Sequence, residues 1–99
     1  MEWIIKYTKT FKRSLKKLNK GIARRVVKKI NVLYSNPFKG KPLRNLYLYI
    51  GDNRFRVYSL RVGDYRVAYI VNHLEKTIYL LYVDHRDNIY EKLRHLTES

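Results

Sequence analysis

Residues 60–66 read LRVGDYR and form a turn between two runs of strand-forming residues. The upstream run, Phe55 to Arg61, and the downstream run, Tyr65 to Asn72, are rich in the β-branched and aromatic residues that favour strands. Gly63 can supply the positive φ that a tight turn requires, and Asp64 is a common turn residue. The stretch therefore predicts an antiparallel hairpin.

A further strand and a helix follow this hairpin. Thr77 to Val83 is mostly apolar, which predicts a central strand that is covered on both faces. From Asp87 to about Leu96 the apolar residues recur at helical spacing, which predicts a C-terminal helix.

The N-terminal part predicts a strand, Trp3 to Tyr7, and two short helices. Thr8 or Thr10 can cap the first helix, and the run Asn19-Lys20-Gly21 breaks it from the second. The short connection predicts a hairpin of antiparallel helices. Their core-facing positions are Phe11, Leu15 and Leu18 in the first helix, and Ile22, Val26, Ile30 and Leu33 in the second.

The middle of the chain predicts a loop and a possible short strand. The second helix should end near Asn36, because a proline disfavours helical geometry in the residue before it. Pro37 to Asn45 reads as a loop, and Leu46 to Ile50 as the short strand. The whole order predicts one α+β domain over residues 1–99, with an antiparallel β-sheet, an N-terminal helical hairpin and a C-terminal helix, the helices lying on one side.

Charge limits the class of partner. The chain has 22 Lys and Arg against 8 Asp and Glu, a formal net charge of +14, which predicts a polyanionic or acidic protein partner. No acidic residue occurs between Lys6 and Lys29. Basic side chains there could grip RNA phosphates, which supplies affinity without sequence specificity. The candidates in the two helices are Lys16, Lys17, Lys20, Arg24, Arg25 and Lys28.

Other kinds of chemistry find little support in the sequence. With no cysteine, the chain has no disulfide, thiol nucleophile or cysteine-based zinc site. His73 and His95 are isolated, so we expect no metal site, and the absence of a glycine-rich phosphate loop predicts no nucleotide cofactor. Without an apolar segment of membrane-spanning or signal-peptide length, we expect a cytoplasmic protein with no membrane partner.

The run from Arg61 to Arg66, the His85-Arg86 pair, Tyr90 and the basic first helix together resemble the RelE/ParE superfamily of type II toxins over nearly the whole chain. The resemblance implies a RelE-like fold of order β-α-α-β-β-β-α. For the RelE branch it implies a metal-independent endoribonuclease that cuts mRNA in the decoding site of the ribosome and so inhibits translation. It also implies an acidic RelB-like antitoxin, bound in a heterodimer or a heterotetramer.

The resemblance also assigns roles to three residues. Arg66 matches the principal catalytic arginine of the family, Arg86 the second one, and Tyr90 the tyrosine that stacks on or protonates the substrate. Guanidinium groups suit this role because they grip phosphate bidentately and keep their charge. The residues alone leave two alternatives: Arg66 as a solvated strand arginine, and Tyr90 as a core tyrosine.

Other positions near the turn are less clearly assigned. Arg61 could bind mRNA or the carboxylate of Asp64, and His85 is interpreted as structural because neighbouring strand residues face opposite ways. The family often has a cationic residue at two strand positions that Val57 and Ser59 occupy here. Arg54 and Arg56 lie nearby as RNA-binding candidates, and Arg54 could compensate if the strand carries a bulge.

Three functions therefore stay open from the sequence. The first is a ribosome-dependent mRNA interferase that uses Arg66, Arg86 and Tyr90. The second is a ParE-like inhibitor of DNA gyrase without catalysis, and the third is a non-enzymatic RNA-binding protein. The loss of charge at Val57 and Ser59 favours the last two.

Overall fold

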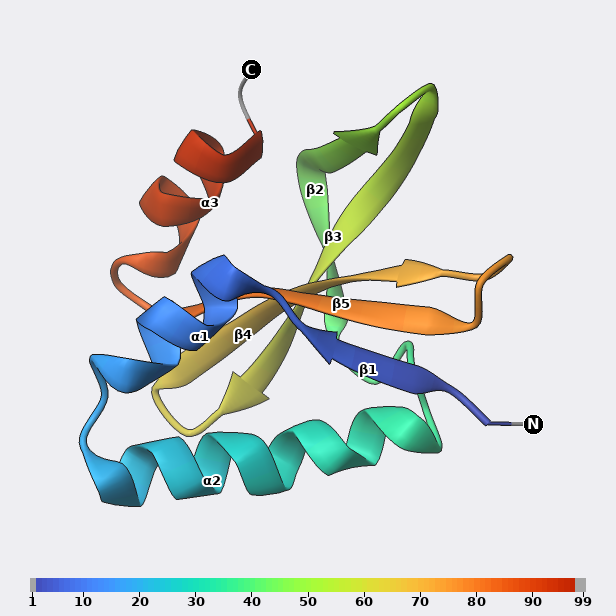
Figure 1. Ribbon diagram of the computed structural model, residues 1–99. Coiled ribbons are helices and arrows are strands. Elements are labelled where there is room, and N and C mark those ends of the chain that lie inside the picture. Colours follow the sequence, from blue (N-terminus) through green and yellow to red (C-terminus); the bar gives the residue numbers. More distant parts are fainter. Residues whose placement is uncertain (1, 98–99) are drawn as a thin grey trace.

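The computed structural model describes residues 2–97. Its five-stranded sheet has the strand order β1-β5-β4-β3-β2, and three α-helices pack against it (Figure 1). No helix in the described residues is both long and apolar enough to span a bilayer. The elements are β1 (Ile4–Tyr7), α1 (Lys9–Lys16), α2 (Lys20–Ile30), the 3-10 helix η1 (Asn31–Tyr34), β2 (Lys41–Ile50), β3 (Asn53–Val62), β4 (Tyr65–Asn72), β5 (Thr77–His85) and α3 (Ile89–Thr97).

The sheet is antiparallel except at one edge. Strands β2 to β5 pair antiparallel with their neighbours, as the sequence predicts, whereas β1 joins β5 in parallel. Tight turns force antiparallel pairing, but β1 is followed by helices and so has no such restriction. Strand β5 lies between β1 and β4, in the interior position expected for its apolar run.

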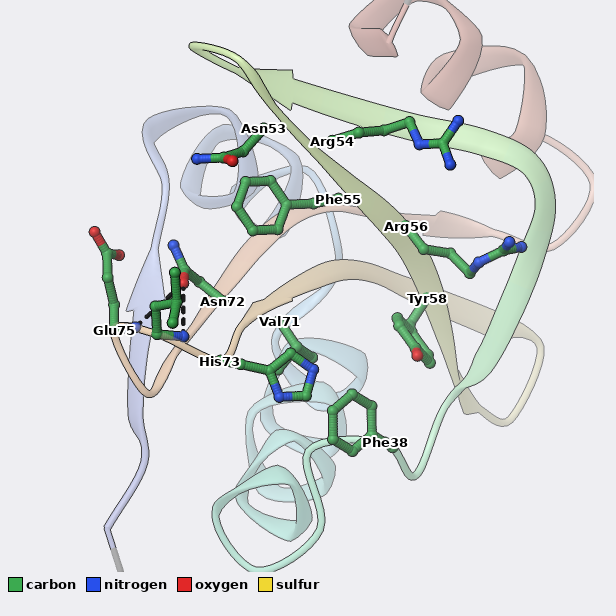
Figure 2. Close-up of a pocket in the computed structure, with 11 residues that line it drawn as sticks. Phe38, Asn53, Arg54, Phe55, Arg56, Tyr58, Val71, Asn72, His73 and Glu75 are labelled. Atoms are coloured by element: carbon green, nitrogen blue, oxygen red, sulfur yellow. Dashed lines mark hydrogen bonds between the residues drawn. The ribbon is translucent and has the colours of Figure 1, made fainter.

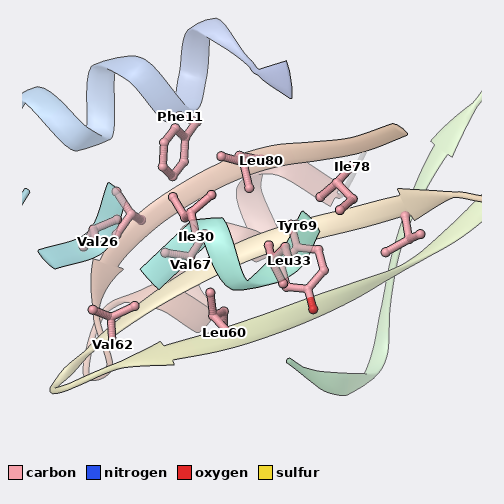
Figure 3. Close-up of a cluster of buried hydrophobic side chains, with 12 residues drawn as sticks. Phe11, Val26, Ile30, Leu33, Leu60, Val62, Val67, Tyr69, Ile78 and Leu80 are labelled. Carbon is pink, nitrogen blue, oxygen red and sulfur yellow. The ribbon is translucent and has the colours of Figure 1, made fainter. Parts of the chain in front are cut away.

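The helices cover both faces of the sheet, so the expectation that they lie on one side is wrong. On one face, α1 and α2 bury Phe11, Val26 and Ile30 against the sheet (Figure 3). On the other face, α3 buries Ile89 and Leu93. The reason lies in β4, whose five consecutive buried residues point alternately to the two faces and need apolar cover on each.

Side-chain caps start both N-terminal helices. Of the two threonines that could cap α1, Thr8 does so: its Oγ1 accepts from the Phe11 N–H at 3.2 Å and donates to the Leu80 carbonyl at 2.6 Å. The Asn19 side chain accepts from the Ile22 N–H at 2.9 Å and caps α2. These bonds satisfy N–H groups that a helix leaves unpaired, and the Thr8 bond also ties α1 to β5.

Strand β2 is longer than the sequence predicts. It begins at Lys41, so more than half of the segment expected to be a loop belongs to the sheet. The pairing with β3 shifts register between Pro42 and Tyr47, and Asn45 within this irregular stretch has a φ of 60°. Such a bulge interrupts the alternation by which a strand is recognised in sequence.

The central packing can be tested by shortening one leucine. Leu80→Ala in β5 should lower the free energy of unfolding by about 2–5 kcal/mol, because Leu80 is fully buried and its loss leaves a cavity. Leu74→Ala removes the same atoms from a side chain that is 95% exposed and should change little. Urea unfolding of both variants measures the difference, and equal losses would contradict this assignment of the core.

Candidate active site

The β3–β4 hairpin brings two arginines to one face of the sheet. Gly63 in the turn has a φ of +60°, as the sequence predicts. Arg61 on β3 is paired directly with Arg66 on β4. Directly opposed residues of an antiparallel pair share a face, and here it is the face that α3 covers.

The guanidinium of Arg66 is held by its own turn. Its Nη1 donates to the carbonyl oxygens of Gly63 and Tyr65, both at 2.9 Å. Among the described residues no hydrogen bond is recorded for Nη2 or Nε, and the side chain is half-buried. Arg66 is therefore an oriented donor with one edge available to an anion.

A cavity of about 580 Å³ gathers Arg61 and Arg66 with Tyr90 of α3. Tyr90 is 49% exposed, while its neighbours Ile89 and Leu93 take the core positions, so the interpretation of Tyr90 as a core residue is wrong. The lining includes no carboxylate. Its other members are Lys29, Lys39, Gly40, Lys41, Leu43, Ser59, Leu60 and Gly63.

Arg86 does not line this cavity. It lies in the turn before α3, where its N–H donates to the Asp64 carbonyl at 2.8 Å and its Nε lies 4.0 Å from Asp87 Oδ1. The helix was expected from Asp87 but begins at Ile89, so Arg86 and Tyr90 are not one helical turn apart. Two of the three predicted catalytic side chains share the cavity, and the third lies outside it.

The structure also defines the contacts of His85 and Arg61 near the turn. His85 packs edge-on against Tyr65, with ring centroids 5.5 Å apart, and its Nδ1 lies 3.4 Å from Asp87 Oδ2. Its N–H also donates to the carboxylate of Asp84. No ion pair between Arg61 and Asp64 occurs in residues 2–97, and Arg61 faces the cavity instead.

The basic face of α2 continues from this cavity. A shallow neighbouring hollow of about 480 Å³ shares Lys29, Arg61 and Gly63 with it and adds Arg25 and Lys28. The other basic candidates of the two helices, Lys16, Lys17, Lys20 and Arg24, are exposed. A polyanion bound at the Arg66 cavity would therefore meet α2 as well.

Arg54 and Arg56 belong to a different place. They line a cavity of about 540 Å³ together with the stacked rings of Phe38 and His73 (Figure 2). Arg56 donates to the Tyr47 hydroxyl at 2.7 Å, and the Arg54 guanidinium lies 4.3 Å from the centroid of the same ring. Neither lines the Arg66 cavity, so Arg54 does not compensate there for the uncharged positions on β3.

The two uncharged positions on β3, Val57 and Ser59, differ in their surroundings. Val57 is fully buried in the core beneath α3. Ser59 lines the cavity and is 8% exposed, and its Oγ is the one buried side-chain polar atom in the described residues without a hydrogen-bond partner.

Lys39 and Lys41 are site residues that the sequence analysis missed. They flank Gly40, whose N–H donates to the buried Tyr69 hydroxyl at 2.9 Å. A Cβ on Gly40 would lie 2.7 Å from that hydroxyl and 2.8 Å from the Ser59 carbonyl oxygen. The signal in the sequence was a lysine on each side of a glycine, but it lay in a segment that was expected to be a loop.

Comparison with known proteins identifies the family. The model described as "ParE toxin of type II toxin-antitoxin system, parDE" matches residues 5–90. The chain belongs to the RelE/ParE superfamily of type II toxins. It is 33% identical over 94 residues to Toxin RelG of Mycobacterium tuberculosis. This alignment covers 93% of this chain and 100% of RelG.

Solved toxin structures resemble this RelE/ParE-type toxin in fold. The RelBE2 toxin–antitoxin complex of Mycobacterium tuberculosis matches with 32% identity and a TM-score of 0.70, over 87% of this chain and 93% of that one. The archaeal RelE–RelB complex of Pyrococcus horikoshii matches with 31% identity and a TM-score of 0.66, over 87% and 97%. The predicted RelE-like α+β fold is confirmed. The element order implied by the resemblance is wrong by one strand, because four strands and not three lie between α2 and α3.

The burial of Tyr69 should make the stability of this toxin fall at alkaline pH. Burial raises the pKa of Tyr69 to about 12, outweighing the Gly40 hydrogen bond, which lowers it. A raised pKa in the folded state stabilises the protein below pH 10, and this contribution is lost as the pH rises through 12. The stability advantage of wild type over Tyr69→Phe should therefore shrink between these pH values.

Urea unfolding of wild type and Tyr69→Phe at several pH values measures this difference. A stability difference that stays constant between pH 10 and pH 12 would show that Tyr69 is not the titrating group.

Proposed function

We propose that this toxin is a ribosome-dependent endoribonuclease that cleaves mRNA in the decoding site and inhibits translation. The observation that carries the proposal is the cavity in which Arg61, Arg66 and Tyr90 meet among lysines, with no carboxylate in its lining. A cationic site of this kind attracts a phosphodiester and repels a positively charged substrate. Identity with RelG and with RelE-type chains at and above 31% supports the same branch of the family.

The proposed reaction is the attack of a ribose 2′-hydroxyl on the adjacent phosphorus. The O2′–P bond forms and the P–O5′ bond breaks, which leaves a 2′,3′-cyclic phosphate and a 5′-hydroxyl. Arg66 donates to the non-bridging oxygens as the phosphorane becomes more negative. Tyr90, which lines the same cavity, stacks on a base or gives its hydroxyl proton to the leaving O5′.

The proposed regulator is an acidic RelB-like antitoxin in a heterodimer or a heterotetramer. The RelBE2 and archaeal RelE–RelB structures are toxin–antitoxin complexes, and the net charge of +14 would favour an acidic partner. The proposed targets of the free toxin are the ribosome and its mRNA.

A second candidate is inhibition of DNA gyrase without catalysis. Two observations favour it: the matching family model describes a ParE toxin, and Arg86 lies outside the cavity. Induction of the toxin in growing cells separates the two. Incorporation of labelled methionine should fall before that of labelled thymidine, and the opposite order would make the gyrase proposal the better one.

Loss of the Arg66 side chain should remove catalysis and preserve the fold. Arg66→Ala should slow cleavage of ribosome-bound mRNA by about a hundred- to thousandfold, equivalent to roughly 2.7–4 kcal/mol, because one charge-assisted contact to the phosphorane is lost. The lost bonds to Gly63 and Tyr65 should each cost only about 0.5–1.5 kcal/mol of stability. Single-turnover cleavage and thermal unfolding measure the two effects.

Arg44→Ala is the matched control for Arg66. It removes an exposed β2 arginine that does not line the Arg66 cavity, and it should leave cleavage unchanged. A fully active Arg66→Ala toxin would refute the catalytic role.

The role of the Tyr90 hydroxyl can be tested separately from that of its ring. Tyr90→Phe retains the stacking surface and loses the proton donor, so a tyrosine that protonates O5′ predicts a loss of about 10²–10⁴ in the cleavage rate. If the ring only stacks, cleavage should stay near wild type, whereas Tyr90→Ala should then be impaired. Cleavage by Tyr90→Ala at the wild-type rate would remove Tyr90 from the site.

A further inference from the structure

We propose that Lys41 is a further catalytic residue, whose ammonium group contacts the scissile phosphate of bound RNA. In this toxin it takes the place of the cationic side chain that β3 lacks at Ser59. The inference rests on the proposed RNA cleavage and deepens it. It follows from strand register, from an unpartnered hydroxyl and from the way the chain before β2 is seated.

The register places Lys41 at the site. Lys41 of β2 is paired directly with Ser59 of β3, and directly opposed residues of an antiparallel pair share a face. Ser59 is in turn two residues from Arg61, which is paired with Arg66. Three adjacent strands thus present Lys41, Arg61 and Arg66 on the same face, and all three line the cavity.

Within residues 2–97, the cavity lining contains a buried hydroxyl without a partner, that of Ser59. Ser59 is 8% exposed, and its Oγ has no partner within the described residues. Buried hydroxyl groups are almost always hydrogen-bonded, because leaving one unpaired wastes the bond it made with water in the unfolded chain. A phosphate or ribose oxygen beside Lys41 would give Ser59 the acceptor or donor that the protein itself does not provide.

Gly40 seats Lys41 at this place. Its N–H donates to the buried Tyr69 hydroxyl, and the backbone passes so close that a Cβ would lie 2.8 Å from the Ser59 carbonyl oxygen. Tyr69 is fully buried in the central strand, so its hydroxyl is a rigid anchor. The entry into β2 is therefore held against β3 although it follows a loop.

The charge of Lys41 is available to a ligand. The side chain is exposed, and no ion pair involving it occurs in residues 2–97. The cavity lining holds Lys29, Lys39, Arg61 and Arg66 as well, and no carboxylate. With no anion supplied from within the cavity, an approaching phosphate would be the counter-ion of these groups, and Lys41 would neutralise part of its charge.

The proposed step is balanced as follows. The 2′-oxygen forms its bond to phosphorus while its proton passes to solvent water, and the P–O5′ bond breaks as O5′ takes a proton from the Tyr90 hydroxyl or from water. Lys41 keeps its protons throughout and stabilises the added negative charge on a non-bridging oxygen. A role through charge alone predicts that arginine can replace lysine.

The test compares three variants in single-turnover cleavage of mRNA on ribosomes with an empty decoding site. Lys41→Met should cut at least tenfold more slowly than wild type, and Lys41→Arg should recover most of the rate. Lys9→Met is the matched control, because Lys9 is an exposed lysine at the start of α1 and lines no part of the cavity. Thermal unfolding should show that all three retain the wild-type fold.

Each outcome decides the inference. Loss in Lys41→Met with recovery in Lys41→Arg and normal cleavage by Lys9→Met supports it. Cleavage by Lys41→Met at the rate of Lys9→Met, or a comparable loss in Lys41→Arg, overturns the role of Lys41 while the proposed nuclease stands. A folded wild-type toxin that leaves ribosome-bound mRNA intact overturns the proposed function, and the role of Lys41 with it.

Discussion

The hydrogen-bonded register of β2, β3 and β4 is the constraint on which the site depends. It sets Lys41 opposite Ser59 and Arg61 opposite Arg66, so that cations from three strands share one face. Because side chains alternate along a strand, a slip of one residue in either pairing would turn the cationic side chain of the shifted strand to the opposite face. The positive φ at Gly63 and the close approach of Gly40 hold the two pairings at their ends.

Packing on both faces of the sheet limits where charged side chains can lie. The interior of β4 is buried on each side, by α1 and α2 on one face and by α3 on the other. Cations are consequently kept out of these two cores and lie at positions that solvent reaches, because a buried unpaired charge is very unfavourable. They gather where α2 approaches the β3–β4 turn, and α3 adds Tyr90 to the lining of the same cavity.

How much of the site could be predicted differs from residue to residue. The hairpin that carries Arg61 and Arg66 could be predicted because a Gly-Asp turn between two strand-forming runs specifies it locally, whereas the role of Arg66 was implied only by the family resemblance. Arg86 was placed one helical turn from Tyr90, but α3 begins two residues later than expected, and boundaries are the least certain part of a helix prediction. Lys41 escaped notice because the bulge in β2 breaks the alternation that marks a strand.

The sequence by itself determined the local elements, the hairpin and the excess of positive charge, because propensity, periodicity and composition act between near neighbours. It also carried the motif that identifies the RelE/ParE superfamily. Only the tertiary structure decided the parallel pairing of β1, the placement of α3 on the far face, and the removal of Arg54 and Arg56 from the site. It alone brought Lys41 to Ser59. These features depend on contacts between segments far apart in the chain, which local patterns do not encode.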